Sequence, residues 1–208
     1  YALNGGSGGG GGSADYSPFT TGSSADKILP KEGSNCDVIG SNSTIAGGIQ
    51  NEIGDNTSTI SFIGGGCQNL IGSKQNTAGF IGGGTNNTLH CYTGTGGAIV
   101  GGTNNLLCLS AAGFIGGGSQ NTIKNSDRSV IVGGSNNIIV PGTTAHYISI
   151  VGGYLNTGSC GFAGILGGCQ NHVNNDHSFI IGSSLTSDKD CYTFMNNADV
   201  AGTVSASI

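Results

Sequence analysis

A short unit built around a pair of glycines, written FIGGGCQNLI at residues 62–71, recurs along most of this chain. The second glycine of the pair serves as a reference position for each copy. The reference positions are Gly48, Gly66, Gly84, Gly102, Gly118, Gly134, Gly153 and Gly168, with a degenerate ninth copy at Ser183. They are 18, 18, 18, 16, 16, 19, 15 and 15 residues apart. A period this short, repeated this often, predicts a solenoid.

Two side chains keep fixed places relative to the reference position. Three residues before it stand Ile45, Ile63, Ile81, Ile99, Ile115, Ile131, Ile150, Ile165 and Ile180. Three residues after it stand Asn51, Asn69, Asn87, Asn105, Asn121, Asn137, Asn156 and Asn171, whereas the ninth copy has Thr186. Alternate side chains of a strand point to opposite faces. We therefore expect both sets to face the coil interior and to form an Ile column and an Asn column along the axis.

The asparagines need a specific reason to point inward, because a buried polar side chain is costly unless it is hydrogen-bonded. An amide carries two donor hydrogens and an oxygen with two lone pairs, so it can bond the amide of the next coil while it holds its own turn. Each bond contributes on the order of 1 kcal/mol, and a stack joins the bonds into one cooperative row. We interpret the Asn column as structural and not as catalytic or ligand-binding.

The repeat predicts an all-β fold, a parallel β-solenoid (β-roll) of about nine coils of 15–19 residues. Coils stacked about 4.8 Å apart would pair each strand with its copies above and below. Three segments follow: a Gly-rich flexible arm over 1–33, the solenoid repeat domain over 34–187, and a C-terminal strand and assembly segment over 188–208. Because the chain begins at Tyr1 and ends at Ile208, we expect it to be processed or partial.

Positions on either side of the isoleucine should point outward, and many of them are apolar. Four residues before the reference position stand Phe62, Phe80, Ala98, Phe114, Val130, Ser149, Gly164 and Phe179. Two residues before it stand Gly64, Gly82, Val100, Gly116, Val132, Val151, Leu166 and Ile181. A strand that is apolar on both faces is normally buried on both, and a slim solenoid cannot cover its own outside. We therefore predict an assembly face that a partner chain covers. Its markers are Phe62, Phe80, Phe114 and Phe179.

The composition excludes several classes of function. Glycine makes up 42 of the 208 residues, whereas only 8 % of the residues are charged, so few side chains are available for acid–base catalysis. A net charge of −5 offers no basic surface to nucleic acid. No apolar stretch is long enough to span a membrane. We expect no nucleic-acid partner, no membrane span and no cofactor.

The candidates for site chemistry are weak. The seven cysteines show no CxxC spacing, which argues against a zinc site of the usual kind. Cys91 and Cys108 fall at similar places in adjacent coils and are a candidate disulfide. We interpret His172 and His177, with Asp176 between them, as surface residues and predict no metal site. Three Asn-x-Ser/Thr triplets permit glycosylation of an exported chain, at Asn42, Asn56 and Asn86.

The repeated unit, as in SVIVGGSNNII at 129–139, resembles the head repeats of trimeric autotransporter adhesins and the related β-roll segments of bacteriophage and large-virus fibre proteins. The resemblance covers residues 44–187. The segment YTFMNNADVAGTVSA at 192–206 is similar to the linker that precedes a C-terminal chaperone or tip domain in fibre proteins. The resemblance implies stacked coils of this length that associate as trimers along the axis.

Two functions from different classes are compatible with these features. We prefer a structural subunit of an extracellular fibre or filament, or of a virion fibre, that self-assembles as a homotrimer or end to end. It would present variable loops to a surface, a glycan or a cell-surface receptor, and it would not be an enzyme. The alternative is a solenoid enzyme, either a tailspike-like lyase or hydrolase acting on polysaccharide or a left-handed β-helix acyltransferase. Coils of 15 and 16 residues do not fit three hexapeptides, and no clustered carboxylate pair is evident.

Overall fold

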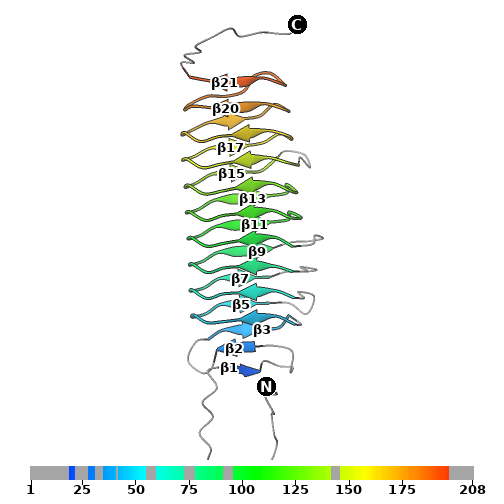
Figure 1. The fold of residues 1–208 in the computed structure, drawn as a ribbon, viewed down its shortest axis with the longest axis vertical. Coiled ribbons are helices and arrows are strands. Elements are labelled where there is room, and N and C mark those ends of the chain that lie inside the picture. Colours follow the sequence, from blue (N-terminus) through cyan, green and yellow to red (C-terminus); the bar gives the residue numbers. More distant parts are fainter. Residues whose placement is uncertain are drawn as a thin grey trace, which may run out of the picture.

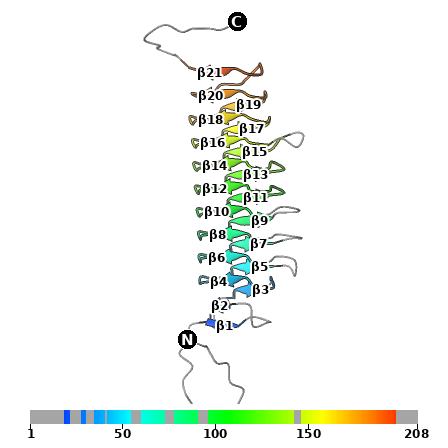
Figure 2. The same cartoon turned by 45° about the vertical axis from the view of Figure 1, so that its right-hand side comes forward.

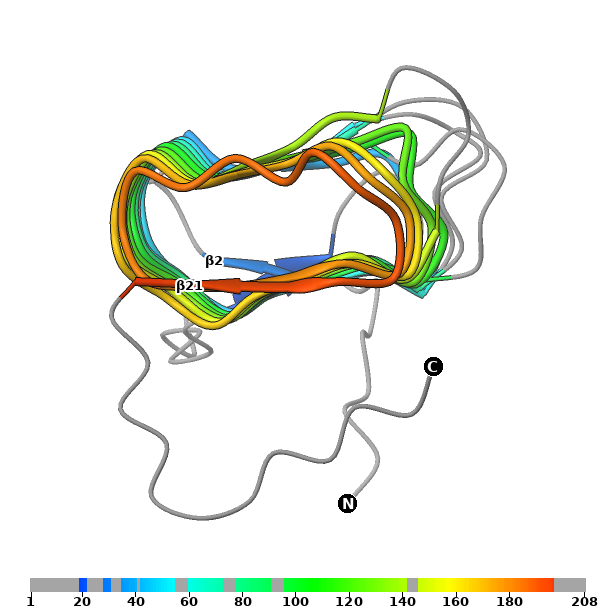
Figure 3. The same cartoon turned by 90° about the horizontal axis from the view of Figure 1, so that it is seen from above.

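The computed structural model describes residues 19–21, 28–30, 35–40, 42–54, 60–72, 78–90, 96–141 and 146–196. Over these residues the chain forms a β-solenoid, a stack of coils with a sheet on each of two opposite sides (Figure 1). Seen along the axis, each coil is a flattened loop whose two sheets face each other across a narrow interior (Figure 3). The predicted fold class is therefore confirmed.

Two sheets are built from very short strands, and even-numbered strands alternate with odd-numbered ones along the stack (Figure 2). The twelve-stranded sheet contains β1 (Phe19–Thr21), β2 (Ile28–Pro30), β4 (Thr44–Ile45), β6 (Phe62–Ile63), β8 (Phe80–Ile81), β10 (Ala98–Ile99), β12 (Phe114–Ile115), β14 (Val130–Ile131), β16 (Ser149–Ile150), β18 (Gly164–Ile165), β20 (Phe179–Ile181) and β21 (Thr193–Met195). The nine-stranded sheet contains β3 (Asp37–Val38), β5 (Glu52–Ile53), β7 (Leu70–Ile71), β9 (Thr88–His90), β11 (Leu106–Cys108), β13 (Thr122–Lys124), β15 (Ile138–Ile139), β17 (Thr157–Gly158) and β19 (His172–Val173).

The strand register places like residues directly over one another. Ile45 pairs with Ile63, Ile63 pairs with Ile81, and the parallel pairing continues in this way to Ile180. All nine isoleucines of the Ile column are fully buried. A second apolar column, on the nine-stranded sheet, runs through Ile53, Ile71, Leu89, Leu107, Ile123, Ile139, Gly158 and Val173. Together the two columns form one continuous core.

The gap that Gly158 leaves in the second column is filled from the same coil. A Cβ built at Gly158 would lie only 2.6 Å from Cγ2 of Ile148, so the Ile148 side chain occupies the space that an apolar residue fills in the other coils. Ile148 is itself buried, and it stands where Ser129 stands in the preceding coil. The core volume is therefore conserved by an exchange between two positions.

The corner between the sheets explains the reference glycines. Their φ angles lie between 80° and 92°, in a region that side chains with a Cβ rarely adopt. A Cβ at Gly134 would also overlap the backbone of Gly153 in the next coil. We call these eight residues the inner glycine column: Gly48, Gly66, Gly84, Gly102, Gly118, Gly134, Gly153 and Gly168.

Strands also lie within the two predicted terminal segments. β1 and β2 form an antiparallel pair inside 1–33, the segment predicted to be a flexible arm, and β2 then pairs in parallel with β4. At the other end, β21 lies inside 188–208 and continues the parallel stack, with Phe194 in register with Ile180. The stack thus includes β21, in which Phe194 packs against the apolar core. The predicted strand pattern over 200–208 lies outside the described residues.

Candidate functional site

The predicted assembly face lies on the outside of the twelve-stranded sheet. Phe62 and Phe80 are 38 % and 39 % exposed, and their rings stack with centroids 5.8 Å apart. Phe179 is also exposed, whereas Phe114 is half-buried. The four markers point outward on neighbouring or nearby strands, as the alternation along each strand requires. Whether a partner covers them stays a prediction.

The phenylalanine rings lie over glycines of their own chain. A Cβ at Gly64 would come within 3.4 Å of the Phe62 ring, and a Cβ at Gly116 would come within 3.3 Å of the Phe114 ring. The ring of Phe179 covers Gly164 in the same manner. Aromatic rings packed on strand glycines compensate for the missing side chains. Part of each ring is therefore already covered within the monomer.

In the four coils from Ala98 to Gly164 that lack a phenylalanine four residues before the reference, an aliphatic side chain stands two residues before the reference. Val100, Val132 and Leu166 are 48 %, 51 % and 53 % exposed. The outer face therefore stays apolar from coil to coil, and it carries no charged side chain at either position over β4 to β20. We call these aliphatic residues the outer aliphatic column: Val100, Val132, Val151, Leu166 and Ile181.

The Asn column lies inside the coil corner and is fully hydrogen-bonded. Nδ2 of Asn87 donates to the Gly83 carbonyl of its own corner at 3.0 Å and to the Gly102 carbonyl of the next coil at 2.9 Å. It also lies 3.1 Å from Oδ1 of Asn69. Oδ1 of Asn87 accepts from the backbone N–H of Asn105 at 3.1 Å. The donations to two glycine carbonyls recur at all eight asparagines, and no amide is left over for a ligand.

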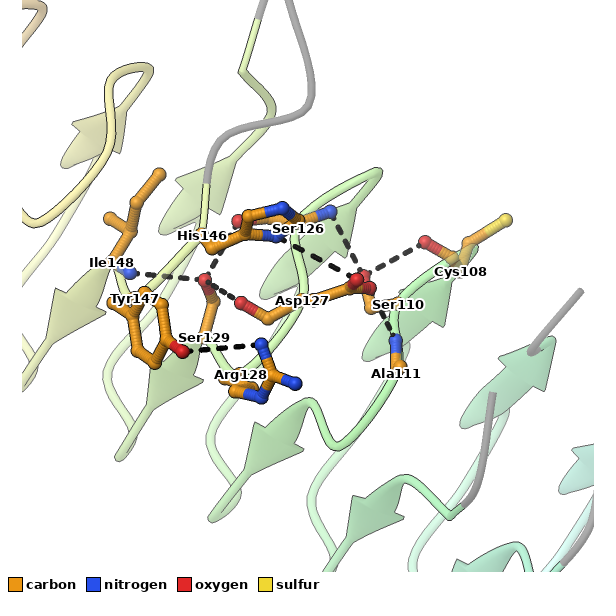
Figure 4. A network of polar contacts seen from close by, with 10 residues as sticks. All are labelled: Cys108, Ser110, Ala111, Ser126, Asp127, Arg128, Ser129, His146, Tyr147 and Ile148. Carbon is orange, nitrogen blue, oxygen red and sulfur yellow. Dashed lines mark hydrogen bonds and ion pairs between the residues drawn. The ribbon is translucent and has the colours of Figure 1, made fainter. Parts of the chain in front are cut away.

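The second corner is the turn by which each coil passes from the nine-stranded sheet to the next strand of the twelve-stranded sheet. It brings serine, histidine and aspartate side chains together (Figure 4). Nδ1 of His146 lies 3.7 Å from Oδ2 of Asp127, which is too long for a hydrogen bond. Ser126 and Ser129 are fully buried, and their hydroxyl oxygens are 2.7 Å apart. Ser129 also accepts from the Ile148 N–H at 3.1 Å. These contacts join the turns of adjacent coils and present no accessible nucleophile.

Aspartates hold the same corner in other coils. Oδ1 of Asp127 accepts from the Ala111 N–H at 2.7 Å, and Oδ1 of Asp176 accepts from the Gly161 N–H at 2.8 Å. In each case a carboxylate of one coil caps the backbone of the previous coil. These charge-assisted hydrogen bonds from backbone N–H groups stabilise the turn.

A stack of flat side chains, which the sequence analysis missed, runs along the second corner. The ring centroids of Tyr147 and Phe162 are 5.1 Å apart, and those of Phe162 and His177 are 4.9 Å apart with planes at 4°. The Arg128 guanidinium lies over the Tyr147 ring at 5.5 Å. All four residues have φ between 51° and 63°, which costs about 1–3 kcal/mol each. Stacking offsets about 0.5–1.5 kcal/mol per pair.

His172, Asp176 and His177, which the sequence analysis weighed as metal ligands and interpreted as surface residues, each have a separate contact. His177 stacks on Phe162, Asp176 caps Gly161, and Nε2 of His172 lies 3.1 Å from the Ser159 hydroxyl. Within the part of the chain that the structure describes, no group of three or more His, Cys, Asp or Glu side chains is placed to hold a metal ion. No helix of the described residues is long and apolar enough to cross a membrane.

The candidate disulfide cannot be placed in full, because Cys91 lies outside the described residues. Cys108 has a free thiol, is half-buried, and stands in register with His90 and Lys124. Burial raises the pKa of Cys108, although nearby Lys124 lowers it in part. The pKa of Cys160 is raised by burial and by the carboxylates of Asp176 and Asp190.

We expect Cys108 and Cys160 to react slowly with iodoacetamide near pH 8. Because the thiolate is the reactive form, a raised pKa lowers the reactive fraction at a given pH and moves the rate profile upward from the usual value of about 8.5. Peptide mass spectrometry after timed labelling between pH 7 and 10 would measure this, with the chain in denaturant as the control. Equal rates at both cysteines in the folded and unfolded chain would contradict the prediction.

Two of the three candidate glycosylation sites lie within the described residues. Asn42 and Asn86 are exposed at tight turns, with φ of 51° and 56°. Asn56 lies outside the described residues. Exposure makes Asn42 and Asn86 accessible, and their modification stays a prediction.

The fold and these surfaces define a β-solenoid repeat protein. No protein-family model matches the chain, and no curated protein matches it.

Proposed function

We propose that this chain is a structural subunit of an extracellular or virion fibre, a straight rod that associates with copies of itself. The observation that carries the proposal is the outer face of the twelve-stranded sheet, which is apolar and uncharged over β4 to β20. Monomeric proteins rarely expose continuous apolar patches larger than a few hundred Å². An apolar face that continues from coil to coil is not the scatter of single exposed apolar residues that is normal on a protein surface.

The interior of the rod supports the same role. Every coil is bonded to the next through both sheets and through the Asn column, so bending the rod would strain many hydrogen bonds at once. Strength of this kind suits a fibre. Contact with a surface, a glycan or a receptor belongs, in this proposal, to the variable segments between coils, such as 142–145, which lie outside the described residues.

The described chemistry gives no support to the alternative of a solenoid enzyme. The serine hydroxyls at the second corner are buried, and the carboxylates of Asp127 and Asp176 accept backbone hydrogen bonds. A glycosidase would need two carboxyl groups free to face a sugar. We therefore retain the structural role as the one proposed function.

We expect the purified chain to form particles several times heavier than its 20.5 kDa. Light scattering coupled to size-exclusion chromatography would give the mass, and electron micrographs would show rods side by side or end to end. Dilution to nanomolar concentration serves as the control for weak association. A particle of 20.5 kDa at micromolar concentration would contradict the proposed function.

A further inference from the structure

Glycine occupies one outward position in all nine coils. We call these residues, one before each reference position, the outer glycine column: Gly47, Gly65, Gly83, Gly101, Gly117, Gly133, Gly152, Gly167 and Gly182. Each follows a residue of the two-before-reference series directly in the chain, at the start of the corner. Unlike the inner glycine column, they do not contact the backbone of the next coil closely.

The fold of the monomer does not explain this glycine column. At Gly101, Gly133 and Gly152 the φ angle lies outside the left-handed region, and a Cβ would meet no atom within 4 Å. Four others, Gly65, Gly117, Gly167 and Gly182, have φ between 146° and 156°, which does favour glycine. At the first three positions, however, a Cβ would fit the isolated chain without a clash. Glycine is a common choice where another backbone or a ligand approaches the chain closely.

We propose that the outer glycine column and the outer aliphatic column form the contact with a second copy of this chain, which packs the same strip against it. The inference rests on the proposed self-association and names its surface. The strip is distinct from the phenylalanine markers, because the rings of Phe62, Phe114 and Phe179 already lie over glycines of their own chain. The side chains of Val132 and Leu166 are instead exposed, and each is followed by a glycine that has no side chain.

Three properties of the strip select a second copy as its occupant. It carries no charge over β4 to β20, so it offers nothing to a charged partner. Its side chains recur at the strand spacing of about 4.8 Å, and a second copy has the same spacing along its whole length. Two outward positions in each of nine coils give 18 residues, close to the lower end of the roughly 20–30 residues per side of a stable interface.

The experiment adds bulk to the strip without changing its apolar character. In the full chain, the pair Gly133→Leu and Gly152→Leu should weaken self-association at least about tenfold, measured by sedimentation velocity over a dilution series. If hydrophobicity alone held the copies together, these leucines would strengthen association instead. The control pair, Thr122→Leu and Thr157→Leu, presents the same two leucine side chains on the outside of the nine-stranded sheet and should leave association unchanged. Far-UV circular dichroism would establish that each variant is folded.

The outcomes separate the inference from the proposed function. A wild-type chain that is monomeric overturns both. A wild-type chain that assembles, with the Gly133→Leu and Gly152→Leu pair unchanged or tighter, overturns only the inference. Equal weakening by the control pair also overturns it. If the leucine pair does not fold, the single change Gly133→Ala replaces it: a several-fold weakening supports the strip as the contact, and unchanged association overturns it.

Discussion

Replacing Asn121 by leucine should destabilise the solenoid by about 3–5 kcal/mol. Asn121 donates through Nδ2 to the carbonyls of Gly117 and Gly134, at 2.9 and 3.0 Å. Its Oδ1 accepts from the backbone N–H of Asn137 at 3.0 Å. Leucine has the same number of side-chain heavy atoms but can form none of these bonds, so the Asn137 N–H would be left buried without its acceptor. An unsatisfied buried donor costs about 1–3 kcal/mol by itself.

The measurement is denaturant and thermal unfolding followed by circular dichroism at one fixed protein concentration. For a chain of this size, 3–5 kcal/mol corresponds to a fall in Tm of roughly 10 °C. Gln120→Asn is the matched control, because it changes an exposed amide at the adjacent position of the same corner and keeps a residue type that tolerates its φ of 57°. An unchanged Tm for Asn121→Leu would remove the structural role assigned to the Asn column.

The fold could be predicted because its determinants keep fixed offsets from the reference position, although the coils differ in length. Every coil places an isoleucine at the same distance from the reference position, and in-register pairing of Ile63 with Ile81 follows once the coils stack. What the period could not show is compensation between positions, as where Ile148 fills the space beside Gly158.

The features that sequence reasoning missed depend on the turn at the second corner. Tyr147, Phe162 and His177 look like unrelated loop residues, because they differ in residue type although they are 15 residues apart. Only the closed turn, with φ near 55° in each coil, brings them into one stack. The signal was present as a flat side chain six residues before three successive reference positions. Recognising it requires aligning the coils backwards from the glycine pair.

The candidate assembly face was only partly visible in the sequence. The alternation of side chains indicated that Phe62 and Phe80 point outward, and the structure places them there. It did not indicate that each ring would lie over the glycine two residues later, although Phe and Gly occur together at these two positions in the coils of Phe62, Phe80 and Phe114. A contact within one strand and a contact with a partner both require apolar residues, so the residue types alone do not distinguish them.

Adding one methyl group should lower the stability of the fold at the inner glycine column and leave it unchanged at the outer glycine column. We expect Gly134→Ala to cost about 3–5 kcal/mol or to prevent folding, because its φ of 86° is unfavourable for alanine and the new Cβ would overlap the backbone of Gly153. Relief of that overlap would push adjacent coils apart, as in an overpacked core. Gly133→Ala, one residue earlier, places its Cβ in open space and should leave the unfolding free energy of the separated chain within about 0.5 kcal/mol. Urea unfolding of both variants at low protein concentration would measure the difference. Similar costs at the two positions would mean that the corner geometry is not what fixes the inner glycine column.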